Sequence, residues 1–275
     1  RVYYCATCDA WHELTTHDTA RTYRPGTSNN SNDNRQFYEA CTSRLDALKN
    51  AVNTFIQKVH TAAIGTDGKY GTEDDVRHRI AIVGFANYSN YNDYDNTEVF
   101  IGARGYKYGT DASGQYENAL QFMNTQSGYN NVVASKNALD ASGATYVDLG
   151  IEMANGIFGA NDIPLSDSEE RGRVMIVFTD GVPGYSGGFG DGAYGSTGGG
   201  YSSANNATAV ANKAIENAYT TKNTYKATVY TVGVFEGANA SNPTTLPGTN
   251  NITQDSKDVN ANRCMHLTSS NYIEA

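Results

Sequence analysis

The chain has 275 residues, of which 39% are hydrophobic and 18% charged, with a formal net charge of −9 and a pI of about 5.0. This length is enough for one large α/β domain or for two small ones. The apolar content argues against a wholly disordered chain, and the lack of a basic stripe argues against a nucleic-acid partner. No apolar run approaches the ~18 residues of a membrane span, so we expect no membrane insertion in this segment.

The N-terminal region, residues 1–42, is rich in Asn, Thr and Tyr and shows no helix or strand periodicity, so we expect an irregular insertion or extension. Its cysteines and histidines follow the spacing Cys5-x2-Cys8-x3-His12-x4-His17. Four such side chains can bind Zn²⁺ tetrahedrally, although the step from Cys8 to His12 is unusually short. The other interpretations are a Cys5–Cys8 disulfide and pairing with cysteines outside these residues.

A helix is predicted after residue 43, where Ser43 and Asp46 form a capping signal. Its apolar residues recur at helical spacing: Leu45, Leu48, Val52, Phe55, Ile56 and Val59. A polar loop over residues 65–77 follows the helix. The continuous apolar run over residues 80–86 is then typical of a strand buried on both faces.

The polar loop carries a second candidate metal site. Between residues 65 and 75 it combines several glycines with four carboxylates, Asp67, Glu73, Asp74 and Asp75. Spaced oxygen ligands with intervening glycines suit Ca²⁺, although the spacing is not that of an EF-hand. A solvated acidic turn explains the same residues without a metal, and the sequence leaves both interpretations open.

Between residues 87 and 144 the sequence predicts polar loops around a weak strand near 99–102 and short helices near 115–125 and 130–140. A longer helix follows from Thr145 to Phe158.

The rest of the chain alternates strands with helices. It predicts a strand at 173–178, a long Gly-rich loop at 182–203, a helix at 204–222, a strand at 225–235 and a last helix near 256–269. This alternation is typical of parallel βαβ units. We therefore expect a doubly wound, mostly parallel sheet with helices on both faces, and a ligand site at the carboxyl ends of its strands.

Two residues fall at that expected edge. Asp180 follows the strand RVMIVF directly, and its carboxylate can bind a hard cation, although Asp-Gly pairs also end strands simply because they turn well. Thr145 opens a helix, and its hydroxyl can bind a cation. It can equally cap the helix, with Asp148 completing a capping box.

The order of these segments resembles the von Willebrand factor type A (vWA) family over most of residues 43–270. The matching segments are RLDALKNAVNTFI, RIAIVGFA, SGATYVDLGIEMA, RVMIVFTDG, YKATVYTVGVF and the closing MHLTSSNYIEA, which resembles the last helix of bacterial surface members. The resemblance implies a Rossmann-like fold with a metal-ion-dependent adhesion site that holds Mg²⁺, Mn²⁺ or Ca²⁺. It places the family's Thr ligand at Thr145 and its Asp ligand at Asp180, and a partner's carboxylate completes the coordination.

The sequence departs from the family at one point. The family's Asp-x-Ser-x-Ser loop after the central first strand is missing, and the partial matches Asp111 to Ser113 and Asp140 to Ser142 follow no buried strand. Residues 1–42 contain no apolar run that could form this strand. We therefore expect residues 43–275 to be an incomplete vWA domain whose first strand lies upstream of Arg1, with a metal site that binds Mg²⁺ weakly by itself.

The resemblance also implies a disulfide. In vWA folds the helix after Cys41 and the helix that contains Cys264 share a face of the sheet, which predicts a Cys41–Cys264 bond. Such a bond would close a long loop and contribute ~4 kcal/mol in the chain-entropy model.

The expected function is that of an extracellular bacterial cell-surface module within a larger multidomain protein. It binds a protein or host-surface ligand through a divalent cation. No Gly-x-Ser-x-Gly elbow or phosphate-binding Gly loop occurs, so we do not expect an enzyme. One alternative is a structural or assembly domain with a degenerate metal site. Another is a cytosolic vWA subunit of an ATPase complex, which requires all four cysteines to be free thiols.

Overall fold

The structure is a computed structural model, and it describes residues 2–5, 10–13, 44–86, 97–109, 114–140, 145–161, 172–179, 204–234 and 264–274. The chain divides into two compact units, Arg1–Leu48 and Lys49–Ala275. The fold is mixed α/β with several small sheets.

The N-terminal unit contains a β-hairpin where the sequence predicted no regular structure. Strand β1 (Val2–Cys5) pairs antiparallel with β2 (Ala10–Glu13). Their sequences, VYYC and AWHE, are short but rich in valine and aromatic residues, which favour strands. Strands of this length carry too few residues to show a clear alternation, which explains why the pattern alone did not reveal them.

The first predicted helix is confirmed as α1 (Arg44–Ala63), most of which lies in the larger unit. Its inward residues Val52, Ile56 and Val59 belong to a cluster that also contains Val132 of helix α2 (Gln126–Ala138). These apolar residues, which recur at helical spacing, therefore form the surface through which α1 packs against α2.

The polar loop over residues 65–77 is called the acidic loop below. The strand predicted after it is present as β3 (Arg79–Ile80) and β4 (Ile82–Gly84). Its side chains alternate between two layers of helices. Ile80 and Ile82 pack with the cluster of α1 and α2, whereas Ala81 and Val83 pack with the cluster that contains Met153 of helix α3 (Val147–Ala160). Both faces of this strand therefore pack against apolar clusters, but its residues are half-buried and not fully buried as the sequence predicted.

The expectation of a mostly parallel sheet is wrong for this part of the chain. Strand β4 pairs antiparallel with β5 (Glu98–Ile101), and β5 pairs antiparallel with β6 (Arg104–Lys107). A two-residue turn joins β5 to β6, and Gly102 in it has a φ of 61°, which glycine adopts without strain. So short a connection permits only an antiparallel pair, because a parallel one needs a crossover of about a dozen residues.

The expected helix near residues 115–125 is also wrong. Residues 114–120 form turns, and β7 (Gln121–Phe122) pairs antiparallel with β3. Helix α2 begins after Thr125, whose hydroxyl accepts a hydrogen bond of 3.0 Å from the Gly128 N–H. This N-cap satisfies a backbone donor at the first turn and fixes where the helix starts.

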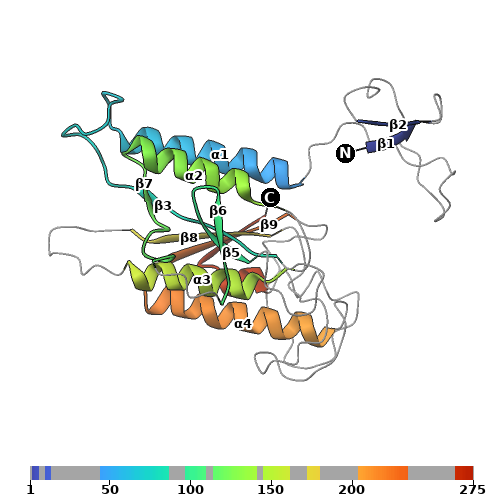
Figure 1. Ribbon diagram of the computed structural model, residues 1–275. Coiled ribbons are helices and arrows are strands. Elements are labelled where there is room, and N and C mark those ends of the chain that lie inside the picture. The colour runs from blue at the N-terminus through green and yellow to red at the C-terminus, as the bar shows by residue number, and fades with distance from the viewer. Residues whose placement is uncertain are drawn as a thin grey trace. The chain divides into compact units, whose positions relative to one another are not determined.

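The C-terminal strands form a parallel sheet in the order β10-β9-β8. Helix α4 (Ala204–Asn223) lies between β8 (Val174–Thr179) and β9 (Thr228–Gly233) in the chain, as expected for a βαβ unit. Figure 1 shows α1 and α2 on one side of β8 and β9, and α3 and α4 on the other.

The last predicted helix ends one residue earlier than expected, and the start predicted for it, residues 256–263, lies outside the described residues. It covers residues 264–268 of the described chain, and residues Asn271–Glu274 form β10 beside β9. Two serines end the helix: Ser269 Oγ donates to the His266 carbonyl at 3.0 Å, and the Ser270 N–H donates to the Val229 carbonyl at 2.6 Å. The second bond directs the chain onto the edge of β9, so the segment NYIE pairs there instead of continuing the helix.

Helices α3 and α4 are joined by buried polar side chains as well as apolar ones. Asn155 Nδ2 donates to the Asn217 carbonyl at 2.8 Å, Thr221 Oγ1 donates to Asn155 Oδ1 at 2.6 Å, and Asn217 Nδ2 donates to the Asp148 carbonyl at 3.0 Å. Buried polar groups that find partners fix one register between two helices, because a shift would leave them unsatisfied.

At Gly150, helix α3 packs closely against Phe85. A Cβ there would lie 2.7 Å from Cδ1 of Phe85, directly after β4. We expect Gly150→Ala to destabilise the protein by about 1–3 kcal/mol, because overpacking outweighs the gain in helix propensity. Urea unfolding measures this difference.

The matched control is Gly172→Ala, where a Cβ meets nothing within 4 Å. It should change the unfolding free energy little, and Phe85→Leu should recover part of the loss in Gly150→Ala. Equal stability of wild type and Gly150→Ala would contradict the close packing of α3.

Candidate functional site

The start of α3 determines the role of Thr145. The N-cap is Tyr146, with φ −82° and ψ 59°, and no side chain makes a cap hydrogen bond. The interpretation of Thr145 as the helix cap is therefore wrong. Thr145 lies one residue before the cap, half-buried, and its hydroxyl is not used to start the helix.

Asp148, which the sequence indicated as the second half of a capping box, is a buried acid at the start of α3. It lies in the first turn of α3 and is 0% exposed, and its backbone carbonyl accepts the hydrogen bond from Asn217. A carboxylate in the first turn interacts favourably with the N-terminal end of the helix dipole. The sequence signal was present, since an acid interrupts the apolar run VDLGI, but only the structure shows that this side chain is buried.

The second predicted ligand, Asp180, lies outside the described residues, and it follows directly on the last residue of β8, Thr179. Thr179 is 4% exposed, and its carbonyl accepts a hydrogen bond of 2.8 Å from the Val234 N–H, one residue after β9. The carboxyl ends of β8 and β9 are thus aligned where Asp180 begins.

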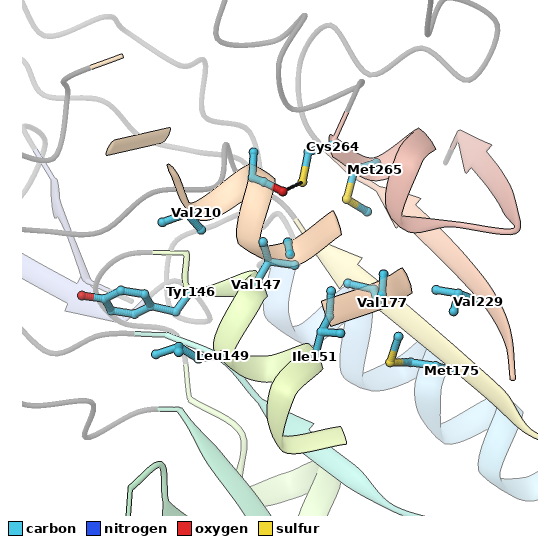
Figure 2. Close-up of a cluster of buried hydrophobic side chains, with 13 residues drawn as sticks. Tyr146, Val147, Leu149, Ile151, Met175, Val177, Val210, Val229, Cys264 and Met265 are labelled. Atoms are coloured by element: carbon cyan, nitrogen blue, oxygen red, sulfur yellow. Dashed lines mark hydrogen bonds between the residues drawn. The ribbon is translucent and has the colours of Figure 1, made fainter. Parts of the chain in front are cut away.

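Helix α3 and strand β8 share one hydrophobic cluster. Tyr146, Val147, Leu149 and Ile151 of the helix start pack with Met175 and Val177 of the strand, as Figure 2 shows. The two predicted ligands are therefore adjacent in sequence to elements of the same core, Thr145 before α3 and Asp180 after β8.

The carboxylates of the acidic loop accept hydrogen bonds from donors within the same loop. Asp74 Oδ2 accepts from the Thr66 N–H at 2.7 Å and from the Thr66 hydroxyl at 3.0 Å, while Thr72 Oγ1 donates to Asp74 Oδ1 at 2.8 Å. Asp67 Oδ1 accepts from the Lys69 N–H and Asp75 Oδ2 from the Gly71 N–H, both at 2.8 Å. These bonds favour the acidic-turn interpretation over the Ca²⁺ site.

The Thr72 hydroxyl, followed by the N–H and the hydroxyl of Thr66, lowers the pKa of Asp74 from its ordinary 3.8 to about 2. In the described part of the chain, no group of three or more His, Cys, Asp or Glu side chains is placed to hold a metal ion. Three of the four loop carboxylates instead gather around the Thr72 hydroxyl, whose oxygen lies 3.4 Å from Asp67 Oδ1, 2.8 Å from Asp74 Oδ1 and 3.5 Å from Asp75 Oδ1.

Cys264 is a free thiol in this structure, which argues against the predicted Cys41–Cys264 disulfide. Its side chain is fully buried in the cluster of α3, α4 and β8, and Sγ donates to the Ala211 carbonyl at 3.8 Å (Figure 2). Burial raises the pKa of this thiol to about 12. Its predicted partner Cys41 lies outside the described residues.

The N-terminal cysteine and histidine set is only partly described. Cys5 ends β1 opposite Ala10, and His12 lies in β2 opposite Tyr3, so these two positions are two rungs apart on one ladder, with the Tyr4–Trp11 pair between them. Cys8 and His17 lie outside the described residues. Zinc binding and a Cys5–Cys8 disulfide therefore both stay predictions.

Comparison of the chain with family models, with curated proteins and with solved structures gave no match. Among the described helices, none has both the length and the apolar character that crossing a membrane requires.

The lowered pKa of Asp74 predicts a pH dependence. Because the ionised form is favoured in the folded protein, its contribution to stability is complete above the ordinary pKa of 3.8 and is lost as the pH falls towards about 2. We expect Asp74→Asn to lower the melting temperature near neutral pH and to lose this difference in acid. The control is Glu73→Gln, the exposed neighbouring acid. A constant difference between wild type and Asp74→Asn down to acid pH would contradict the assignment.

The burial of Cys264 predicts slow thiol chemistry. We expect iodoacetamide to label Cys264 in the native protein roughly a hundred-fold or more slowly than in denaturant, because both access and the thiolate fraction are low. Peptide mass spectrometry after timed labelling, without reductant, measures this rate. Detection of Cys264 in a disulfide, or rapid native labelling, would contradict its place in the core.

Proposed function

We propose that this chain is a vWA-like ligand-binding module that uses a divalent cation at the carboxyl edge of its parallel sheet. The observation that carries the proposal is the shared core of α3 and β8, with Thr145 before the helix and Asp180 after the strand. Thr145 is not used as a cap, which leaves its hydroxyl for a ligand role. The alternation of α3, β8, α4 and β9 in the chain further supports the Rossmann-like arrangement.

The open edges of two sheets support the expectation of one more strand. Among the described strands, β4 pairs only with β5, and β8 pairs only with β9. Helix α3 contacts β4 and β5 in one sheet and β8 in the other, so it bridges the two. Val174 and Ile176 of β8 are 53% and 37% exposed, on the opposite face to the buried Met175 and Val177. We propose that a further apolar strand, the first strand of the family pattern, belongs between β4 and β8.

Thr145 and Asp180 by themselves do not complete the coordination of a hard cation. Thr145 offers a neutral oxygen and Asp180 a carboxylate, whereas Mg²⁺ prefers six oxygen ligands and gives up its water reluctantly. We propose that the loop after the additional strand and the carboxylate of a partner supply the remaining ligands. The metal then bridges the module and its protein or host-surface partner, in the extracellular setting of a larger surface protein.

A second proposal is a structural or assembly domain with a degenerate metal site. Two observations favour it: the sequence has no Asp-x-Ser-x-Ser segment, and the described residues contain no cluster of three metal-binding side chains. Under this alternative, Thr145 and Asp180 have no role in binding. The cytosolic ATPase-complex interpretation is separated from both by labelling in denaturant without reductant, since it requires Cys5, Cys8 and Cys41 to be thiols as well.

The test uses Mn²⁺ as a probe ion, because its paramagnetism reports weak binding. We expect the 275-residue chain to bind Mn²⁺ weakly by electron paramagnetic resonance titration, and Asp180→Ala and Thr145→Ala each to weaken this binding several-fold. Glu117→Ala, an exposed acid in a turn outside the proposed site, is the control and should leave the titration unchanged. Unchanged binding in Asp180→Ala and Thr145→Ala would overturn the metal-dependent proposal and favour the degenerate site.

A further inference from the structure

The acidic loop is attached to the helices through a tyrosine that has two hydrogen-bond acceptors and one proton. Tyr70 Oη lies 3.2 Å from Nε2 of His60, in the last turn of α1, and 3.3 Å from Oε1 of Gln126, in the first turn of α2. A hydroxyl donates a single proton, so it can serve only one of these acceptors at a time.

The tautomer of His60 decides which acceptor is available. His60 Nδ1 lies 2.8 Å from the Met123 carbonyl, which can only accept, so Nδ1 carries a proton in both charge states. In the neutral ring Nε2 is then an acceptor for Tyr70. In the imidazolium Nε2 is a donor to Tyr70 Oη, and the tyrosine proton must turn to another acceptor.

Neighbouring side chains hold the His60 ring and the Gln126 amide in the positions that this change of hydrogen-bond acceptor requires. The His60 ring stacks on Tyr129 of α2 with centroids 4.2 Å apart and planes inclined by 27°. Gln126 Nε2 donates to Asn130 Oδ1 at 3.0 Å, which orients Oε1 of the same amide towards Tyr70. A cation on His60 is also compatible with its place at the C-terminal end of α1 and with the face of Tyr129.

We propose that Tyr70 is a proton-dependent latch between the acidic loop and helices α1 and α2. With neutral His60, the tyrosine donates to Nε2 and ties the loop to α1 alone. With protonated His60, Nε2–H donates to the tyrosine oxygen and the tyrosine O–H donates to Gln126. The loop is then tied to α1 and α2 at once, so acidification tightens it.

No ion pair competes with this exchange at His60 within the described residues. The charged groups on the surrounding elements are Arg44, Asp46, Lys49 and Lys58 on α1, Lys136 on α2, and Asp67, Lys69, Glu73, Asp74, Asp75, Arg77, His78 and Arg79 in and after the loop. Of the acids, Asp74 and Asp75 accept from loop donors, and Asp75 also accepts from Asn124 Nδ2 at 3.4 Å. Tyr70 and the Met123 carbonyl are the hydrogen-bond partners that His60 has in this structure.

The test compares melting temperatures on the two sides of the usual titration range of histidine, at about pH 5.5 and about pH 8. Tyr70→Phe removes one hydrogen bond of the neutral state and two of the protonated state, so its melting temperature should fall about twice as far at the lower pH. Tyr219→Phe, an exposed tyrosine on α4, is the control and should melt like wild type at both pH values.

Two background variants identify the partners. In a His60→Gln background and in a Gln126→Met background, Tyr70→Phe should cost the same at both pH values, because either the proton or the second acceptor is missing. Amide hydrogen exchange of residues 65–76, corrected for the intrinsic pH effect, should slow in wild type at the lower pH. Equal losses for Tyr70→Phe at both pH values, or a pH dependence that persists in the His60→Gln background, would overturn the latch.

Discussion

The position of helix α3 is the constraint on which the rest of the larger unit depends. Its first turns belong to the cluster with β8, β9 and α4, and its later residues Met153 and Ile157 belong to the cluster with β5. A single helix with apolar contacts in two clusters fixes two separate sheets relative to one another. Gly150 sets the spacing on one side through its contact with Phe85, and the Asn155, Asn217 and Thr221 bonds set the register with α4 on the other.

Long periodic patterns were the part of this fold that the sequence revealed well. The helical spacing of α1 and α3 and the apolar runs of β8 and β9 predicted these elements, because each buries one consistent face or both. The sequence pattern did not predict the short strands β6, β7 and β10, because they have only two to four residues each. Their pairing is decided by tertiary contacts, such as the Ser270 bond to β9, and by the tight turn at Gly102, which makes the β5–β6 pair antiparallel.

At the candidate site too, the sequence pattern indicated which residues to consider, whereas their burial and hydrogen bonds depend on tertiary packing. The sequence indicated Thr145 and Asp180 from their places beside a helix and a strand, but not whether Thr145 caps the helix, which depends on the backbone at Tyr146. It gave no measure of the burial of Asp148 and Cys264, because both depend on what α4 places over them. Spacing alone also could not separate a metal loop from an acidic turn, because the Thr66 and Thr72 donors to Asp74, which favour the turn, depend on the folded loop.

The central claim is that α3 and β8 bring Thr145 and Asp180 to one cation site. The most direct measurement is an anomalous difference map from crystals of this chain soaked in Mn²⁺. The account predicts a peak within coordination distance of the Thr145 hydroxyl and the Asp180 carboxylate, beyond the carboxyl end of β8. A map with its Mn²⁺ peaks only in the acidic loop or at the N-terminal hairpin, and none between these two residues, would contradict it.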